Sequence, residues 1–302
     1  MRLVGLALLC AVSVCWSPSW AYEEIAVTDG GTIKGTVTMT GGKPTPKGYN
    51  LITFPDPVYC GRISTGTGWR ILGEFSMASS QGLKDVVVVL TDVTKGKPFK
   101  FEPLTIEARD CRFLPFVTVV KDGSEVAVMN MDPVMHDIQA YETSQLGPRD
   151  LFNTPLPMNP HHKRFVSAES HEHLAGEPVT EVIHMTKGRR IFLMQCGFHA
   201  YMESWGFAVD NPYFALTGDD GTFSLTDVPP GDYTLMVWHP GVGTMLQKKV
   251  TVTEKGLSNV DFDFKAPQGR RSVHEIEQNP HYGPESLGKV VDIRPTLQRQ
   301  VP

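Results

Sequence analysis

Short apolar runs separated by turn residues recur along most of the chain, and this pattern constrains the fold more than any other feature. The stretch "DVVVVLTDVTKGKP", residues 85–98, is a continuous β-branched run that ends at Gly-Lys-Pro, and "GTIKGTVTMTGGKP", residues 31–44, alternates before its Gly-Gly turn. A continuous run of this kind is typical of a strand buried on both faces. Together with 28 glycines and 23 prolines, such runs predict an all-β protein.

Two pairs of runs read as hairpins. "PFVTVVKDGSEVAVMNMD", residues 115–132, predicts a turn at Asp122-Gly123, and "VTEVIHMTKGRRIFLMQC", residues 179–196, predicts one at Lys187-Gly188. The second pair places Cys196 at a strand end. Residues 141–178 between the pairs have little periodicity, so we expect a long connection there.

The N-terminus has the pattern of an export signal. Arg2 precedes an apolar run, and Ser19-Trp20-Ala21 is a small-residue cleavage pattern, so residues 1–21 are predicted to be removed. The alternative is a membrane-retained N-terminal helix. No later stretch reaches the roughly 18 apolar residues of a spanning helix. We therefore expect a periplasmic or extracellular protein with no spanning segment in its mature chain.

Export sets the cysteine pairing. Of five cysteines, Cys10 and Cys15 leave with the signal, which leaves Cys60, Cys111 and Cys196 in an oxidising compartment. The economical arrangement is a Cys60–Cys111 disulfide with Cys196 reserved for a metal. The alternative is that Cys196 is a free thiol packed in the core.

Several functional classes find no support. The formal charge of −5 gives no basic footprint for nucleic acid. No nucleophile–base pair, phosphate loop or carboxylate dyad has a useful spacing, so we do not expect an enzyme that acts on a small molecule.

The stretch "MQCGFHAYM", residues 194–202, has the residue types of a metal site. The thiolate of Cys196, the imidazole of His199 and the thioether of Met202 form a soft donor set that favours copper, with zinc as the competitor. His136 in "VMNMDPVMHDI" is the best donor of a second imidazole. An alternative for Met202 is that it only fills the core, with Glu203 as the axial ligand. An alternative for His136 is that it is a buried histidine that binds no metal.

"NMDPVMHD" followed by "CGFHAYM" resembles the cupredoxins, the small blue-copper electron carriers, over residues of about 85 to 212. The resemblance implies a Greek-key β-sandwich with ligands His136, Cys196, His199 and Met202. The family's structural asparagine falls on Asn130, and Asp137 stands where the family often has Asn. We expect an apolar shell around the metal from Met135, Phe198, Tyr201 and Trp205. The alternative is that these four residues belong to an ordinary sandwich core.

For this exported chain without catalytic motifs, the resemblance implies one type 1 copper that carries single electrons. Its redox partner, such as a cytochrome or a respiratory complex, is implied by the family alone. Two alternatives remain: a copper-binding or copper-delivery protein of the cell envelope, and a metal-free structural β-sandwich subunit.

Residues 219–241 resemble the carboxypeptidase-regulatory-like or transthyretin-like sandwich, and the stretch after residue 30 resembles the opening strand of that family. The expected division is a copper domain at 22–213, whose N-terminal strand is shared with a second sandwich at 214–265, and an extended or disordered tail at 266–302. The resemblance implies that this second module serves as a scaffold or as a docking surface.

The connection at 141–178 and the strand after it carry further histidines. A second copper or zinc site could draw on His161, His162, His171, His173 and His184, and the alternative is a solvated polar loop. His171-Glu172-His173 is an H-x-H of the kind that multicopper oxidases use. Because Cys196 is flanked by Gln195 and Gly197, however, a trinuclear oxygen-reducing centre lacks its ligands.

Overall fold

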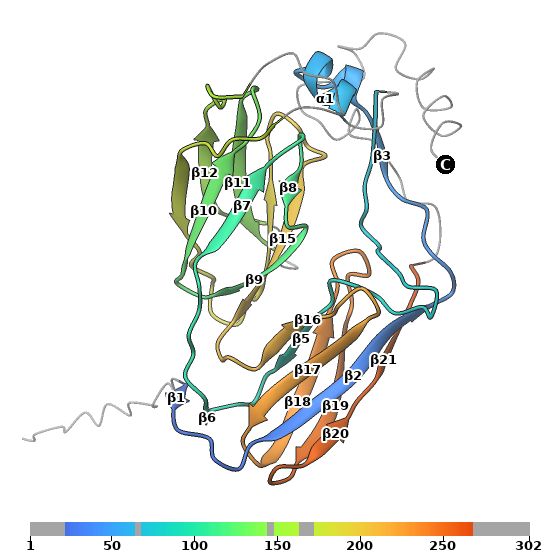
Figure 1. Cartoon of the computed structure of the whole chain (residues 1–302), viewed down its shortest axis with the longest axis vertical. Helices are drawn as coiled ribbons and strands as arrows, with labels where there is room; N and C mark the ends of the chain where they lie inside the picture. Colours follow the sequence, from blue (N-terminus) through green and yellow to red (C-terminus); the bar gives the residue numbers. More distant parts are fainter. Residues whose placement is uncertain (1–21, 64–67, 144–147, 163–171, 268–302) are drawn as a thin grey trace, which may run out of the picture.

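The computed structural model describes residues 22–63, 68–143, 148–162 and 172–267 (Figure 1). The predicted signal peptide and residues 268–302 of the predicted tail lie outside the described residues. Strands dominate the described part of the chain, with η1 (Leu51–Thr53) and α1 (Pro57–Ile63) as its helical segments. The predicted all-β class is confirmed.

The lower sandwich in Figure 1 combines strands that are distant in sequence. Its outer sheet has the order β17-β2-β20, with β21 also paired to β2, and its inner sheet has the order β16-β5-β18-β19. The bounds of the outer sheet are β2 (Gly31–Thr40), β17 (Thr222–Val228), β20 (Leu257–Asn259) and β21 (Phe262–Lys265). Those of the inner sheet are β5 (Val87–Leu90), β16 (Phe214–Leu216), β18 (Gly231–Trp238) and β19 (Met245–Val252).

The N-terminal strand β2 therefore lies within the lower sandwich, paired to β17, β20 and β21. Strand β5, which the sequence grouped with the copper domain, also belongs to it, between β16 and β18. All of β5 is buried, as its apolar run predicted: Val88 and Leu90 face the lower core, whereas Val87 and Val89 face the upper sandwich.

The upper sandwich contains the predicted metal ligands. One sheet has the order β12-β11-β14-β15-β9 and the other β13-β10-β7-β8. The bounds of the first are β9 (Val117–Lys121), β11 (His136–Glu142), β12 (Arg149–Leu156), β14 (Ile191–Gln195) and β15 (Glu203–Val209). Those of the second are β7 (Leu104–Ala108), β8 (Phe113–Leu114), β10 (Glu125–Asn130) and β13 (Pro178–Val182).

The two predicted hairpins are wrong, although both turns exist. Gly123 and Gly188 have φ of 80° and 84°, as turn glycines do. However, β9 and β14 lie in one sheet, whereas β10 and β13 lie in the other. Each turn thus crosses between the sheets, because the apolar faces of its two strands meet in one core instead of lying side by side.

The predicted long connection contains a strand. β12 pairs antiparallel to β11 at the edge of its sheet, and Pro155 faces Asp137 in this pair. Proline is tolerated on an edge strand because its missing N–H leaves no ladder partner unpaired on the open side. The prolines that suggested a loop are therefore compatible with β12.

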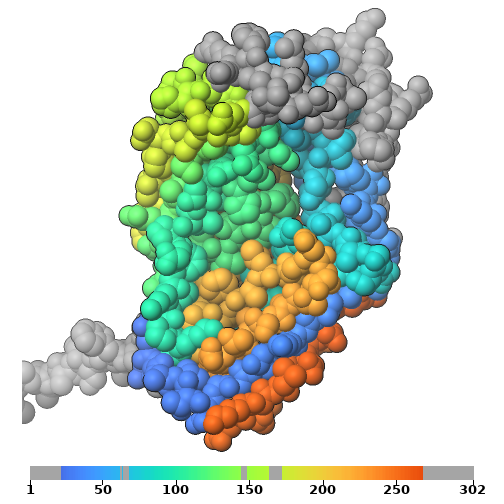
Figure 2. All heavy atoms as spheres, in the orientation of Figure 1, coloured from blue at the N-terminus to red at the C-terminus, as the bar shows by residue number. Residues whose placement is uncertain are grey.

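A third apolar core joins the two sandwiches. It includes Val87 and Trp238 from the lower sandwich, and Val117, Trp205 and Phe207 from the upper one. The rings of Phe207 and Trp238 lie 5.7 Å apart between centroids. In Figure 2 the lower, largely orange and blue part and the upper green part meet directly, so the four sheets of the two sandwiches are held by three successive cores.

Two short pairs complete the fold. β1 (Glu23–Glu24) runs parallel to β6 (Lys95–Gly96), and β3 (Gly48–Asn50) pairs with β4 (Trp69–Ile71). Between β3 and β4 the chain forms η1 and α1 at the upper end of the molecule (Figure 1). The side chain of Asn50 caps η1 by accepting a hydrogen bond from the N–H of Ile52.

Candidate metal centre

The ligand loop is the connection between two paired strands. Strand β14 ends at Gln195 and β15 begins at Glu203, and these two residues face each other in the ladder. The loop is closed by backbone hydrogen bonds from Cys196 N–H to Met202 O, at 3.1 Å, and from Met202 N–H to His199 O, at 2.7 Å. This turn folds Cys196 and His199 toward one point.

His136 reaches the same point from β11, which is the neighbour of β14 in the sheet. The Nδ1 atoms of His136 and His199 lie 3.2 Å apart. Cys196 Sγ lies 3.6 Å from His199 Nδ1 and 3.9 Å from His136 Nδ1. All three residues are 0% exposed.

These separations fit a shared metal ion. Bonds of roughly 2.0 to 2.3 Å place two ligand atoms about 3 to 4 Å apart when the angle at the metal is about 100–130°. The three measured distances fall in this range. The three predicted ligands are thus brought together by two strands and one loop.

Hydrogen bonds at the far nitrogens orient both rings. His136 Nε2 lies 2.9 Å from Asp132 Oδ2, and His199 Nε2 lies 3.1 Å from the carbonyl oxygen of Pro55. Both partners are acceptors, so each Nε2 carries hydrogen. In neutral rings, the two Nδ1 lone pairs then face each other, an arrangement that favours a cation between them.

Burial favours the neutral forms of His199 and Cys196 when no metal is bound. Burial, with the neighbouring His136 as a further cause, lowers the pKa of His199 to about 3. Burial also raises the pKa of the Cys196 thiol to about 12. A thiolate at this site therefore needs a cation as its partner.

Asp132 is a site residue that sequence reasoning missed. It is fully buried and accepts hydrogen bonds from the N–H groups of Asp110 and Cys111, both at 2.8 Å, and from the Tyr59 hydroxyl at 3.0 Å. Burial alone would raise its pKa, but the bonds from His136 and from these amides lower it. The sequence signal that could have pointed to Asp132 as a partner of His136 is its position four residues before that histidine.

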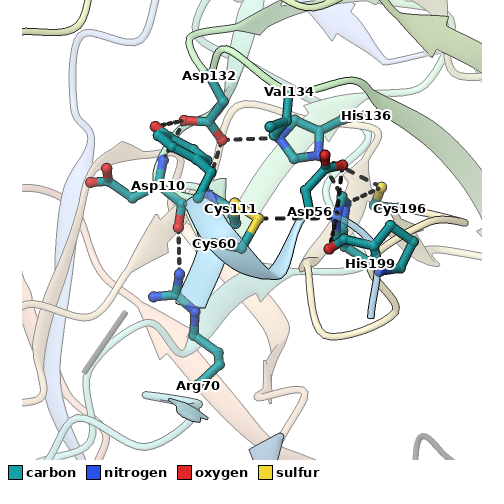
Figure 3. The surroundings of a disulfide bond; sticks show 12 residues. Asp56, Cys60, Arg70, Asp110, Cys111, Asp132, Val134, His136, Cys196 and His199 are labelled. Carbon is teal, nitrogen blue, oxygen red and sulfur yellow. Dashed lines mark hydrogen bonds and ion pairs between the residues drawn. A yellow bond between two sulfur atoms is a disulfide. The ribbon is translucent and has the colours of Figure 1, made fainter. Parts of the chain in front are cut away.

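The predicted disulfide is present and lies against the site (Figure 3). Cys60 and Cys111 are bonded, and Cys60 Sγ is 4.0 Å from His199 Nε2. Because Cys111 N–H also bonds Asp132, this disulfide adjoins the hydrogen-bond partners of both histidines. No sequence pattern placed the disulfide, or the Pro55 carbonyl, next to the site.

Met202 is 1% exposed and belongs to the same apolar cluster as Cys196. The side chain of Asn130 makes three hydrogen bonds: its amide donates to the carbonyls of Val134 and Pro157, both at 2.9 Å, and its oxygen accepts from Asp132 N–H. These bonds fix the turn that leads to His136.

Of the other residues predicted to lie around the metal, some contact the ligand loop and some do not. Asp137 ties β11 to the ligand loop, because its carboxylate accepts hydrogen bonds from Gly197 N–H, at 2.5 Å, and from the Gln139 side chain. Phe198 is 38% exposed and does not seal the site. Trp205 lies on β15 and packs in the core between the sandwiches instead of against the ligand loop. Its ring centroid is 6.3 Å from that of Trp238.

Of the remaining apolar candidates, Tyr201 is buried and its ring lies 5.7 Å from that of His199, whereas Met135 is 43% exposed. The predicted apolar shell is therefore only partly formed by these residues.

The histidines proposed for a second metal site differ in burial. His161 and His184 are exposed, and His171 lies outside the described residues. His162 and His173 lie 5.3 Å apart between ring centroids, and His173 Nε2 is 3.1 Å from Asp110 Oδ1. The ligand atoms of Asp110, Asp132 and His173 lie within 4.8 Å of one another.

Comparisons with known proteins find one family model and several solved structures that are similar to parts of this chain. The carboxypeptidase regulatory-like domain matches residues 209–265. Among solved structures, a purple cupredoxin from Nitrosopumilus maritimus is 17% identical with a TM-score of 0.25, and the match covers 35% of this chain and 99% of that one.

Two further solved structures are similar to parts of this chain. A copper-containing nitrite reductase from Thermus scotoductus is 20% identical, with 37% of this chain and 24% of that one covered and a TM-score of 0.25. A reduced Cu(I) form of an amicyanin mutant is 13% identical, with 36% and 85% covered and a TM-score of 0.24. No curated protein matches the chain. Within the described residues, no helix has the length and apolar character needed to cross a membrane.

Proposed function

We propose that this protein binds one copper ion through His136, Cys196 and His199, with Met202 as the axial ligand. The observation that carries the proposal is the pair of Nδ1 atoms, 3.2 Å apart, that face each other with Cys196 Sγ beside them while both Nε2 atoms face acceptors. A soft cation bound there satisfies both lone pairs and stabilises the thiolate.

The donor set favours copper over zinc. Structural zinc sites close a tetrahedron from several cysteines or histidines. Here the described groups that can meet at one point are one thiol and two imidazoles, and the loop adds a thioether, which suits copper.

We infer a carrier of single electrons rather than an enzyme. When bound, copper supplies a centre that gains or loses one electron. The chain supplies rigidity: the ligand loop is closed by backbone bonds, and Asp132 and Pro55 hold the two imidazoles. Fixed ligands reduce the rearrangement that accompanies a change of oxidation state.

The exit for the electron is proposed at His199. Its Nε2 meets the Pro55 carbonyl, and the neighbouring Asp56 side chain is 43% exposed, 3.8 Å from the same nitrogen. This is a short route from the ligand to the surface. A second route begins at Cys196 and continues along β14. The partner is proposed to be another redox protein, such as a cytochrome or a respiratory complex.

We also propose that the protein is exported and acts in the periplasm or outside the cell. In this account the copper domain lies within residues 22–213, and the scaffolding module consists of residues 214–265 together with β2 and β5, which belong to it by their pairing. The Cys60–Cys111 disulfide supports an oxidising compartment.

Voltammetry tests the carrier function. The copper-loaded protein should give one reversible one-electron wave, Cys196→Ser should abolish it, and His161→Ala, an exposed histidine outside the site, should leave it unchanged. A copper-delivery protein would instead hold colourless Cu(I) and lose it quickly to a chelator. Absence of a wave in protein that contains stoichiometric copper would contradict the proposal.

A further inference from the structure

A cavity of about 200 Å³ lies beside the metal-binding loop. A single water needs only about 10–15 Å³ of such space, so the cavity has room for a small molecule. It is formed where β4, β8 and the beginning of β15 approach each other. The residues of its wall that matter here are Arg70, Arg112, Phe113, Phe116, Tyr201 and Glu203.

The cavity has a buried cation in its wall. Arg70 is 6% exposed, and one terminal nitrogen of its guanidinium donates to the carbonyl oxygen of Asp110 at 2.5 Å (Figure 3). Within the described part of the chain, its Nε–H has no hydrogen-bond partner. Burial lowers the pKa of Arg70 to about 10, which still leaves it charged at neutral pH. A buried charged donor without an acceptor is costly.

Tyr201 supplies a second donor. It is 2% exposed, and no described group forms a hydrogen bond to its hydroxyl. Its ring is fixed by Phe54 and Tyr49, whose centroids lie 5.1 and 5.9 Å away. Arg70 and Tyr201 both line this cavity, which places the two donors at one site.

We propose that this cavity binds a small, singly charged carboxylate, which accepts hydrogen bonds from Arg70 and Tyr201. The guanidinium presents donors in the planar geometry that suits a carboxylate. A cation is disfavoured by Arg70 and Arg112. A doubly charged anion is disfavoured by Glu203 and by Asp110, whose carboxylate lies 3.5 Å from the Arg112 guanidinium.

This site is distinct from the proposed copper centre and does not require it. The two are neighbours, because Tyr201 lies between His199 and Met202 in the chain and its ring contacts that of His199. A bound carboxylate would therefore be expected to change the surroundings of one metal ligand without coordinating the metal.

Calorimetric titration of the full mature protein with acetate tests the site, with acetamide as an uncharged molecule of the same shape. We expect acetate to bind with a Kd in the millimolar range and acetamide to bind at least about tenfold more weakly, since charge-assisted bonds are the stronger ones. Equal binding of the two, or no binding of acetate up to 100 mM, which is about tenfold above that range, overturns the proposal.

Two variants locate the binding. Tyr201→Phe removes only the hydroxyl and Arg70→Lys keeps the charge but not the planar donors, so each should weaken acetate binding about tenfold or more. The matched control is Tyr22→Phe, whose hydroxyl donates to the Lys97 carbonyl in the lower sandwich. If Arg70→Lys does not fold, Tyr201→Phe decides alone.

Thermal unfolding gives an independent readout. Without acetate, Tyr201→Phe should unfold at the same temperature as the wild type or higher, because it removes a buried hydroxyl that has no partner among the described groups. Acetate should raise the unfolding temperature of the wild type and not that of Tyr201→Phe. An equal rise in both proteins would overturn the assignment of Tyr201.

Discussion

Asp132 connects the imidazole of His136 to the rest of the upper sandwich. It is fully buried, and its two oxygens bond the His136 ring, two backbone amides and Tyr59. The motif "NMDP" places it four residues before His136, but this spacing alone does not determine that its carboxylate turns toward the histidine. The meeting of His136, Cys196 and His199 could be predicted from residue types and spacing, whereas the orientation of the two imidazole rings depends on segments 20 or more residues apart.

Asp132→Asn should therefore weaken copper binding. The amide cannot hold the His136 Nε2–H as a charged acceptor, and loss of such a partner typically costs about 10 to 100-fold in metal affinity. Competition with a chelator measures the change. Asp150→Asn, at an exposed position of β12, is the matched control and should leave the affinity unchanged. Equal affinity of Asp132→Asn and the wild type would show that Asp132 does not support the site.

Glu142 is a second buried carboxylate, and it forms hydrogen bonds with none of the proposed ligands. Its side chain is 0% exposed and accepts hydrogen bonds from Arg149, Arg189 and Thr186, which joins β11 to β12 and to the 186–189 turn. The bonds from Arg149 are the main reason that its pKa falls from 4.5 to about 2.

Because the pKa of Glu142 is lower in the folded protein, its stabilisation is present above pH 4.5 and is lost as the pH falls toward 2. Glu142→Gln should lower the free energy of unfolding by about 1 to 3 kcal/mol at pH 7. Thermal unfolding between pH 7 and pH 2 should show that this difference shrinks with acid. A difference that is constant with pH would contradict the assignment.

At the scale of elements, α1 and its disulfide cover His199. Cys60 in α1 is bonded to Cys111 after β7, at a sequence separation of 51, and Pro55 before α1 supplies the acceptor for His199. The sequence predicted the pairing by elimination. It did not predict the place, because contacts between α1 and the ligand loop leave no local periodic pattern.

The double variant Cys60→Ala/Cys111→Ala should be less stable by about 4 kcal/mol, the entropy expected for a closed loop of this length. It should also release copper to a chelator faster than the wild type, because the cover of His199 is no longer held. Denaturant unfolding and the release rate measure the two effects. An unchanged release rate would show that α1 stays in place without the disulfide.

The strands could be predicted from the sequence, but their pairing into sheets could not. The apolar alternation of β9, β10, β13 and β14 correctly predicted strands, and Gly123 and Gly188 marked the turns. Whether such a turn joins neighbours in one sheet or crosses between sheets depends on the partners of each strand. Those partners, β15 for β9 and β7 for β10, lie elsewhere in the chain.

At the scale of the whole molecule, the apolar core between the sandwiches joins them. Trp238 is 2% exposed and contacts both Trp205 and Phe207 across this core. The sequence motifs suggested two modules, but β5 of the lower sandwich is buried on both faces and also packs into the core between the sandwiches.

Trp238→Ala should destabilise the protein by about 3 to 5 kcal/mol, as large-to-small changes in a core do. If the two sandwiches unfold together, calorimetry should show one transition, shifted to lower temperature. Leu257→Ala, at a position of β20 that is 60% exposed, is the control and should have little effect. Two separated transitions in the wild type would show that the sandwiches are energetically independent.

The central claim is that Cys196, His136 and His199 hold one copper ion. Visible absorption and electron paramagnetic resonance of the mature protein, loaded with one equivalent of Cu(II), test it most directly. We predict an intense visible Cu(II)–thiolate band that disappears in Cys196→Ser and persists in His161→Ala. A copper spectrum that is the same in Cys196→Ser and in the wild type would contradict the account.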